Sequence, residues 1–591
     1  MAREQKKVLI FLGLAFLIIW SYPLWFTAGK AILGDGNIIM QRFEALRQTV
    51  VHYRQWPGLN PWNGGGQPLA GAPYLFIFSL PSLFVLIFGT SAGMGITTIV
   101  YLIIGCIGAW KLASLWWQSI YVKLFFTIFV VSNPALLFHL KAGHIPFEVF
   151  YLMPLLLFYF LRFKEDPWSG LKAAVVYSLA FNDIPNYTLQ YMTVIMVLLF
   201  SWFLIIGPVE ARKKQMRWLA LFAPICLTII AYHAITILQV AGEYPRLSTL
   251  RFHYSWDVIW KSYLYPFTNI AKVFPDPPGV SGGSATRSTH ETACYVGIAS
   301  LLVALASFRR GVKWWHVTTL LLILAGLGND AIYWPMYWLQ KIPTFSSQVA
   351  FARIRITTLL FMGIVVTWGL WVLWEKFKVY NWGRRAVIFI GVFIALEHLA
   401  LGFMIMRGTH VDIDKADPFY RSHYAYLGRT EKSDFMNVSV LPPYESTKLN
   451  IGILRGGGDS HLPMNYWDGV DKSYVGPLGS DEKGYVGEFV QGGKAVKPVY
   501  WSPNRITFRG LDPLLPLSVN MNPSRAWYNN GRQLFPDYRL VEVYTPFEAW
   551  PDSKGTIELS YRFPGRGLGL TITFIAFLAS LAVILFFREA R

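Results

Sequence analysis

Charge is scarce in this chain. Of its 591 residues only 15% are Asp, Glu, Lys or Arg, while 54% are hydrophobic. Soluble domains carry roughly 25% charged residues, so this composition excludes an ordinary soluble protein. It favours an integral membrane protein, because long uncharged segments are what cross a bilayer as helices.

Among the charged residues, acidic ones are fewer than basic ones. The 34 acidic residues face 53 basic ones, which leaves a formal net charge of +19. Such a balance would suit a nucleic-acid partner, but the basic residues stand in short clusters between apolar runs, where they indicate cytoplasmic loops. The main clusters are 162–164, 212–217, 309–313, 376–385, and Arg588 with Arg591. The charge therefore predicts topology and no nucleic-acid partner.

Cysteine is almost absent, and two other features are missing. The three cysteines, Cys106, Cys226 and Cys294, lie in or beside apolar runs and far from metal-ligand spacing, which argues against a disulfide framework. No small-residue cleavage site follows the first apolar run, 8–26, so we expect a retained helix and not a signal peptide. No internal repeat of the kind expected in many transporters is visible.

What the chain does contain is a series of apolar runs that predicts about twelve crossings, with both ends in the cytoplasm. The predicted crossings are 8–26, 93–112, 122–140, 147–161, 171–181, 187–206, 218–240, a span ending at Arg309, 315–327, 356–374, 386–406 and 568–587.

Three further segments are expected at the membrane surface. Residues 74–88 are apolar but short and broken by Pro81, and counting them as a crossing would move Lys111 and Lys123 outside, so we expect a half-inserted helix on the outer face. Residues 38–56 and 254–265 are expected as interfacial helices. In the first of these, apolar residues recur at helical spacing: Met40, Phe43, Leu46 and Val50.

The composition changes abruptly after residue 406. Residues 407–565 are polar, with short alternating runs such as 437–441, 505–508 and 556–560 between Gly and Pro, which is typical of a β-rich domain. The predicted fold class is a polytopic α-helical membrane protein with a C-terminal β-rich extracytoplasmic domain. Its expected domains are 1–406, 407–566, and a last helix with a cytoplasmic tail at 567–591.

The first candidate for chemistry is Asp35, which follows the first apolar run and is expected at the outer membrane surface. Gly34 and Gly36 flank it and let the backbone turn tightly and approach a ligand. An ordinary Asp-Gly turn is the alternative. In the Gly/Pro-rich loop 57–73, Asn63 and Gln67 are candidate sugar contacts.

Other polar residues are expected at the same surface because of the helix count. Asp183 lies at the tip 182–186, where it is either an acidic functional group or a helix cap. His144 lies in an outer turn and either bonds a substrate or is structural. His290 and Glu291 end the long loop 241–291, whose length indicates a lid or binding loop.

Arg353 and Arg355 precede the descending span 356–374. They either anchor the helix among lipid headgroups or clamp a phosphate, which Arg does with a planar two-bond geometry.

Several separated motifs together resemble those of the YfhO-like bacterial membrane proteins of the GT-C glycosyltransferase superfamily. The resemblance covers nearly the whole chain, although each motif is short. The matching motifs are Gly34-Asp35-Gly36, Asn60-Pro61-Trp62-Asn63 with Gly66, Glu291 with Tyr295-Val296-Gly297, Gly326-Leu327-Gly328-Asn329, Ile342-Pro343 to Arg355, and Ser524 to Gly531 with Trp527.

The resemblance implies a GT-C-like fold and transfer of a sugar from a polyprenyl-phosphate donor to a cell-surface glycan, lipid or protein acceptor. It implies that Asp35 is the catalytic acidic residue, with Asp183 and Glu291 as other acidic candidates, and that Arg353 or Arg355 faces the carrier phosphate. Asn37, a candidate substrate contact, stands where a metal-binding Asp-x-Asp would need its second Asp, which leaves the cofactor open and argues against a divalent metal. The rival hypothesis is a non-enzymatic transporter or assembly factor for a surface polymer.

Overall fold

The computed structural model describes most of the helical part of the chain and parts of the remainder. The described residues are 13, 15–25, 30–32, 35–62, 66–69, 77–163, 166–183, 187–206, 209–243, 256–265, 293–328, 332–342, 345, 353–407, 410–412, 425–427, 451–453, 489–492, 494–519, 524–535, 547–562, 569–576 and 578.

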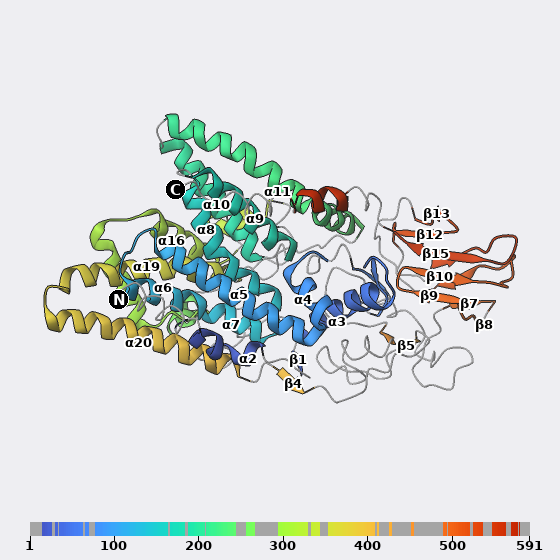
Figure 1. Cartoon of the computed structure of the whole chain (residues 1–591), viewed down its shortest axis with the longest axis horizontal. Helices are drawn as coiled ribbons and strands as arrows, with labels where there is room; N and C mark the ends of the chain where they lie inside the picture. Colours follow the sequence, from blue (N-terminus) through green and yellow to red (C-terminus); the bar gives the residue numbers. More distant parts are fainter. Residues whose placement is uncertain are drawn as a thin grey trace.

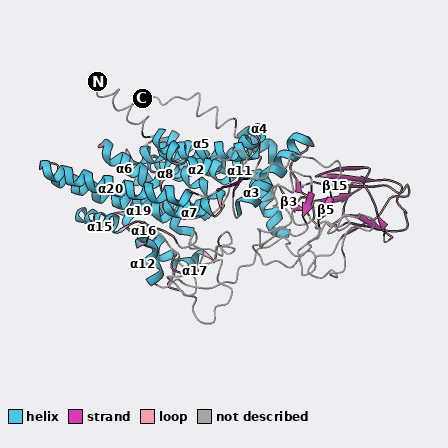
Figure 2. Ribbon diagram, turned by 90° about the horizontal axis from the view of Figure 1, so that it is seen from below, coloured by secondary structure: helices cyan, strands magenta, loops and turns pink. Residues whose placement is uncertain are grey.

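Helices form one end of the elongated molecule and strands form the other (Figures 1 and 2). Among the described residues, seven helical segments are long and apolar enough to cross a membrane, which makes this a multi-helix protein of membrane type. They are Thr90–Ala113, Ile120–Lys141, Ile145–Arg162, Thr188–Ile205, Phe222–Val240, Ile354–Phe377 and Asn381–Met406. We call the helices together the helical body.

The helices of the body follow the predicted apolar runs closely. Their bounds are α2 (Tyr22–Trp25), α5 (Thr90–Ala113), α6 (Ile120–Val131), α7 (Pro134–Lys141), the 3-10 helix η2 (Ile145–Leu152), α8 (Met153–Arg162), α9 (Pro167–Asp183), α10 (Tyr187–Ile206), α11 (Val209–Glu243), α12 (Trp256–Leu264), α15 (Ile298–Ala306), η4 (Ser307–Arg310), α16 (Trp314–Ala325), α17 (Pro335–Leu339), α19 (Ile354–Phe377) and α20 (Asn381–Met406). In the part of the chain that the structure describes, seven of the expected crossings have the length and hydropathy needed. The total of twelve and the orientation stay predictions.

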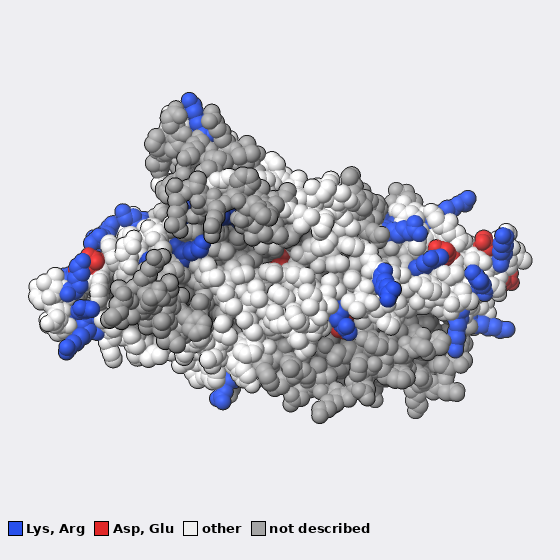
Figure 3. All heavy atoms as spheres, viewed as in Figure 1, with Lys and Arg blue, Asp and Glu red and all other residues white. Residues whose placement is uncertain are grey.

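One end of the helical body carries cations beside aromatic rings, and we call it the basic end. Lys111 Nζ lies 5.6 Å from the centre of the Phe158 ring, and the Arg310 guanidinium lies 4.4 Å from that of Trp371. On the face drawn in Figure 3, Lys and Arg gather at the α19–α20 turn and on the strands, and the helical surface between is mostly uncharged. This pattern suits helices whose ends reach the two surfaces of a membrane.

The segment expected to be half-inserted contains α4 (Leu80–Phe88), which has nine residues and is therefore about 14 Å long. That is less than half of a bilayer core of about 30 Å, in agreement with a segment that does not cross. Gly89 follows with φ 83°, a conformation that favours glycine, and lets the chain turn directly into α5.

The helix expected at the membrane interface, 38–56, forms but is buried inside the protein. Residues 35–52 form α3 (Asp35–Arg47) and a π-helical turn (Gln48–His52), and both the apolar and the polar sides of α3 are buried. Phe43 and Leu46 pack with Val85 of α4 and Ile145 of η2, while Gln41, Arg42 and Glu44 are also enclosed. The apolar spacing was a true signal for a helix. It could not show that other segments cover the polar side as well.

The strands between residues 489 and 561 form two antiparallel sheets, which we call the β-region, as predicted from the alternating pattern. The five-stranded sheet has the order β13-β12-β15-β10-β9 and the four-stranded sheet the order β14-β11-β7-β8. Their bounds are β7 (Phe489–Gln491), β8 (Lys494–Ala495), β9 (Tyr500–Ser502), β10 (Arg505–Phe508), β11 (Leu517–Val519), β12 (Trp527–Asn529), β13 (Arg532–Gln533), β14 (Phe547–Ala549) and β15 (Ile557–Tyr561).

The two sheets share one core. Phe489 of the four-stranded sheet and Phe508 of the five-stranded sheet meet edge to face, with their ring centres 4.8 Å apart. Trp527 packs in the same core, so the sheets lie face to face as in a sandwich. The predicted run 437–441 lies outside the described residues.

The β-region is joined to the helical body by side chains and not only by the chain itself. Asn504, in the turn between β9 and β10, donates to the Trp56 carbonyl and accepts from the Leu59 backbone N–H at 3.0 Å. Gln55 donates to Ser502 at 2.8 Å. The loop that follows α3 is therefore held by the turn of a sheet more than 400 positions later in the sequence.

Candidate functional site

Asp35 is the first residue of α3, so the most strongly predicted acidic residue stands at a helix N-terminus. Directly before it, β1 (Lys30–Ile32) pairs antiparallel with β4 (His410–Asp412), which follows α20. The structure describes the backbone of Asp35 and not its side chain. Asn37, two residues further along, is half-buried in α3.

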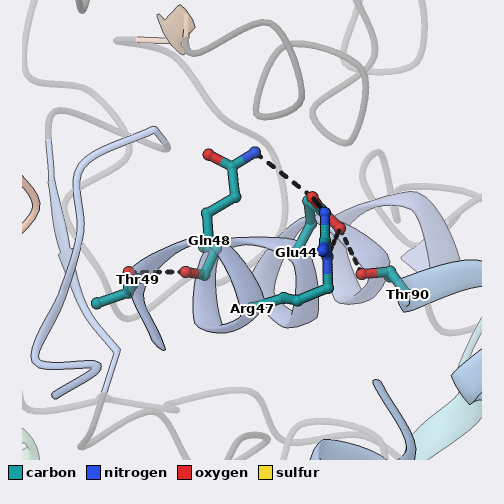
Figure 4. Close-up of polar contacts among 6 residues, drawn as sticks. Glu44, Arg47, Gln48, Thr49 and Thr90 are labelled. Carbon is teal, nitrogen blue, oxygen red and sulfur yellow. Dashed lines mark hydrogen bonds and ion pairs between the residues drawn. The ribbon is translucent and has the colours of Figure 1, made fainter. Parts of the chain in front are cut away.

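A buried polar cluster holds α3 in place (Figure 4). The Glu44 carboxylate accepts from the Arg47 guanidinium at 3.0 and 3.2 Å, from the Gln48 amide at 3.4 Å and from the Thr90 hydroxyl at 2.5 Å. Thr90 is the first residue of α5. Because a buried carboxylate is costly unless it is paired and hydrogen-bonded, this cluster fixes α3 against the start of a membrane-type helix.

A second buried contact joins α3 to the loop that follows it. The side-chain amides of Gln41 and Asn60 bond each other reciprocally at 3.0 and 3.1 Å. Asn60 lies in the motif 60–63, and its backbone in β2 (Leu59–Asn60) pairs with that of Gln67 in β3 (Gln67–Pro68). Asn63 and the side chain of Gln67 lie outside the described residues.

Asp183 ends α9 and caps another helix. Its Oδ1 accepts from the backbone N–H of Leu80, the first residue of α4, at 2.9 Å. Burial raises the pKa of Asp183 well above its usual value, and the bond from Leu80 opposes the rise. Its Oδ2 is buried with no hydrogen-bond partner among the described residues. Asp183 therefore caps α4 from a segment 103 positions away, and its catalytic role stays a prediction.

His144 lies beside a second histidine that the sequence reasoning missed. His139, in the last turn of α7, has its Nδ1 2.9 Å from Nδ1 of His144. Phe147 of η2 stacks on His139 with ring centres 4.6 Å apart and ring planes 24° apart. The Arg353 guanidinium lies 5.6 Å from the centre of the Phe147 ring. The structure therefore brings His144 and Arg353 together across one aromatic ring.

The side chains of Arg353 and Arg355 lie in different surroundings. Residues i and i+2 of a helix differ by about 200° around its axis, so their side chains leave on nearly opposite sides. Arg355 is buried and lies near Tyr263 of α12 and Cys294. Burial raises the pKa of Cys294 to about 12, and the nearby Arg355 opposes the rise. Arg353 thus lies beside the histidines and Arg355 lies near Cys294, and the role of either as a phosphate clamp stays a prediction.

The segment 293–297, part of a predicted motif, is held at the same place. Val296 N–H donates to the Tyr263 carbonyl at 2.9 Å, and the Tyr295 hydroxyl donates to Glu397 of α20. His290 and Glu291, directly before it, lie outside the described residues.

Contacts link these residues into one neighbourhood, at the end of the helical body that faces the β-region. Ile145 of η2 packs with Met40 and Phe43 of α3, and it follows His144 directly. Val85 of α4 belongs to the same cluster, and α4 begins at the residue capped by Asp183. The buried part of α3, the helix capped by Asp183 and the residue after His144 therefore meet in one apolar cluster, whereas Arg355 lies toward α12.

Four polar residues of this region, Glu44, His139, Glu148 and Glu397, were not among the predicted site residues, although the sequence held a hint of each. Glu148 and Glu397 are lone acidic residues inside apolar runs, which by itself indicates function or a specific partner. Thr98 donates to Glu148. The signal for the other two was weaker. Glu44 was visible only as part of the polar face of a helix, and His139 only as one of two histidines across a helix end.

Among the described residues, no group of three or more His, Cys, Asp and Glu side chains is placed to hold a metal ion. A donor set that included Asp35 or Glu291 would lie outside the side chains described. Comparison with known proteins found no family model that matches this chain, and no curated protein that matches it significantly.

Proposed function

We propose that the chain is a GT-C type glycosyltransferase of the cell membrane. It transfers a sugar from a polyprenyl-phosphate-linked donor to an extracytoplasmic glycan, lipid or protein acceptor. Seven candidate membrane spans support a multi-pass protein. The resemblance of the short motifs to the YfhO-like proteins supports the reaction class.

The observation that carries the proposal is the convergence at the β-facing end of the helical body. Asp35 begins α3, a helix that is enclosed on both its apolar and its polar sides. Ile145, which follows His144 directly, belongs to the buried apolar cluster of α3, and the Arg353 guanidinium lies 5.6 Å from the centre of the Phe147 ring. An acidic group and a cationic group near the ends of membrane-type helices are what a lipid-phosphate donor requires, because its reactive bond lies at the membrane boundary.

The chemistry assigns a role to each group. The Asp35 carboxylate takes the proton of the acceptor hydroxyl as that oxygen forms its bond to the anomeric carbon of the sugar. The bond from that carbon to the phosphate oxygen breaks, and its electron pair leaves with the lipid phosphate. Arg353 faces the charge that develops there. Asp183 holds α4, and Glu291 is the alternative acidic residue.

The rival function, a transporter or assembly factor, has one observation in its favour. Glu148 lies inside the candidate span Ile145–Arg162, is buried, and has one carboxyl oxygen without a hydrogen-bond partner among the described residues. Acidic residues at membrane depth occur in proton relays of transporters. Glu148 is not needed for sugar transfer, so the two functions can be separated by mutation.

The test is transfer by the purified protein in lipid vesicles. A panel of radiolabelled polyprenyl-phosphate sugars is offered with a cell-envelope lipid and glycan extract as acceptor, and labelled product is measured. We expect product with at least one donor, loss of product in Asp35→Asn, and little change in Glu148→Gln. If no donor yields product, while Glu148→Gln abolishes substrate uptake into vesicles, the transporter function replaces the enzyme.

A further inference from the structure

At the basic end, two arginines from different elements lie over tryptophans that are one helical turn apart. The Arg310 guanidinium of η4 lies 4.4 Å from the centre of the Trp371 ring. The Arg384 guanidinium, near the start of α20, lies 5.7 Å from the centre of the Trp374 ring. Both tryptophans belong to α19 and are three residues apart, so they share one side of that helix. The two arginines therefore converge on the same stretch of α19.

Both arginines are open to the surroundings, whereas the tryptophans beneath them are half-buried. A guanidinium over an aromatic face is held by attraction to the ring and does not use its N–H groups for that contact. Those groups lie in the plane of the guanidinium, where they match the oxygens of a phosphate. The rings thus hold the two arginines in place and leave their hydrogen-bonding edges for a ligand.

The surface around them is rich in positive charge. In residues 309–313 and 375–385 the one acidic residue is Glu375, which is already paired with Lys378 at 2.7 Å. The exposed cations of these two segments are Arg309, Arg310, Lys313, Lys376, Lys378, Arg384 and Arg385. Apart from Lys378, none of them has an acidic partner among the described residues, and Figure 3 shows Lys and Arg gathered at the α19–α20 turn. Uncompensated charge of this kind attracts an anion.

An exposed apolar surface leads up to these arginines. On α15, which runs directly into η4, the exposed side chains Ile298, Leu302 and Leu305 recur at i, i+4 and i+7 and so lie along one side. Two candidate membrane spans, α19 and α20, meet at the same end. A ligand with an anionic head and apolar chains fits both features, because its head meets the arginines while its chains lie along the helices.

We propose that Arg310 and Arg384, positioned on Trp371 and Trp374, bind the headgroup phosphate of an anionic phospholipid. Arginine binds phosphate through two parallel N–H bonds, and basic sites between membrane helices suit anionic headgroups. A zwitterionic lipid is disfavoured, because its own cation is repelled by the surrounding positive charge. The inference goes beyond the proposed function and does not depend on it, since this end lies opposite α3 and the β-region (Figure 1).

The competing explanation is a general attraction between a basic surface and an anionic bilayer, with no defined site. Two neighbouring arginines separate the two explanations. Arg309 and Arg385 are adjacent to Arg310 and Arg384 in the sequence and are also exposed, but neither lies over an aromatic ring of the described residues. A general attraction should depend equally on all four arginines, whereas a defined site should depend on the two over the tryptophans.

The measurement is binding of phosphatidylglycerol with a fluorescent acyl chain to the full-length protein in a neutral detergent. Phosphatidylcholine with the same label is the reference lipid. We expect Arg310→Gln and Arg384→Gln each to bind phosphatidylglycerol about tenfold more weakly than wild type, the scale of one hydrogen bond to a charged group. The control variants Arg309→Gln and Arg385→Gln should lose less than about threefold, as expected for one exposed charge. Equal losses in all four variants would overturn the proposal, and so would equal affinity of the wild type for the two lipids.

Lysine variants test the arginine geometry and guard against misfolding. Arg310→Lys and Arg384→Lys keep the charge and the long apolar stem, so thermal stability should equal that of the wild type. Their affinity for phosphatidylglycerol should still fall, because an ammonium group cannot form the planar pair of bonds. Full affinity in both lysine variants would overturn recognition by the two guanidinium groups.

Two competitors identify the ligand class. Glycerol 3-phosphate presents the headgroup phosphate without acyl chains and should not displace the labelled lipid at equal concentration. Displacement by it would overturn the lipid assignment in favour of a free phosphate ester. Displacement by a polyglutamate peptide would overturn it in favour of an acidic protein. No arm contains a sugar donor, so the result holds or fails independently of sugar transfer.

Discussion

The two ends of the helical body each carry an ion pair at i, i+3 spacing, and the pairs differ in their surroundings. At the basic end, Lys378 and Glu375 lie 2.7 Å apart, with side chains 47% and 31% exposed. At the β-facing end, Arg47 and Glu44 lie 3.0 Å apart, with side chains 28% and 2% exposed. The first pair is in water. The second pair has a carboxylate that must be satisfied inside the protein.

The comparison separates topology from function. Cations beside Phe158, Trp371 and similar rings serve to position helix ends at a membrane surface. Enclosed polar groups such as Glu44, Asp183 and the histidine pair are expensive to bury, so each needs a partner or a purpose. These groups lie at the β-facing end, and we assign the site there.

The largest expected effect at that end is on Asp35. Asp35→Asn should leave the protein folded and lower sugar transfer at least about a hundredfold, because a general base contributes on that scale. Initial rates of labelled product in vesicles measure the effect, with thermal unfolding as the check on folding. A near wild-type rate would mean that Asp35 is not the general base. Glu291 or Asp183 would then be the candidate, and the start of α3 would take no part in the reaction.

Glu44 should have the next largest effect, on stability. Glu44→Leu removes the acceptor for three side chains, and we expect a loss of about 2 kcal/mol in the free energy of unfolding. A larger loss is not expected, because Arg47 is partly exposed and can turn to water. Denaturant unfolding in detergent measures it. An unchanged stability would mean that the buried pair does not hold α3.

The helices and the sheets were largely predictable from the sequence, and the reasons are local. The run 187–206 matches α10 (Tyr187–Ile206), and the run 505–508 matches β10 (Arg505–Phe508). Each carries its own periodicity and is bounded by turn residues or charges. The burial of α3 was not predictable, since it depends on a turn at Asn504 and on Thr90, which the spacing of α3 does not reveal.

The candidate site was predictable only in part. Asp183 and His144 were placed correctly at helix ends, but their partners Leu80 and His139 come from tertiary packing. The opposite directions of Arg353 and Arg355 follow from the helical repeat alone and could have been read from the sequence. The roles of Asp35 and Glu291 stay predictions, because their side chains lie outside the described residues.

Asp183 offers a smaller effect that depends on pH. Burial raises its pKa above the usual 3.8, so the folded protein holds a proton there that the unfolded chain releases. The free energy of unfolding of the wild type should therefore fall as the pH rises from about 4 through the raised pKa. Asp183→Asn keeps an oxygen for the Leu80 N–H and cannot ionise, so this slope should disappear.

Unfolding at a series of pH values, with Asp512→Asn in the β-region as an exposed control, measures the slope. A variant that keeps the wild-type pH slope would show that Asp183 is ionised in the folded protein, and that α4 is capped by a charge.

The smallest expected effect is at the basic end and completes the comparison. Glu375→Gln breaks an i, i+3 pair of the same spacing as Glu44 and Arg47, but in an exposed position. Exposed pairs of this kind contribute about 0.3 to 0.5 kcal/mol, so stability should change by no more than that, and only at low salt. Sugar transfer should equal that of the wild type, because Glu375 lies in the last turn of α19, at the opposite end of that helix from Arg353. The measurements are the same unfolding and transfer assays, run beside Glu44→Leu. A loss of transfer above about tenfold with normal folding, which corresponds to about 1.4 kcal/mol in the barrier, would mean that the basic end also takes part in the reaction.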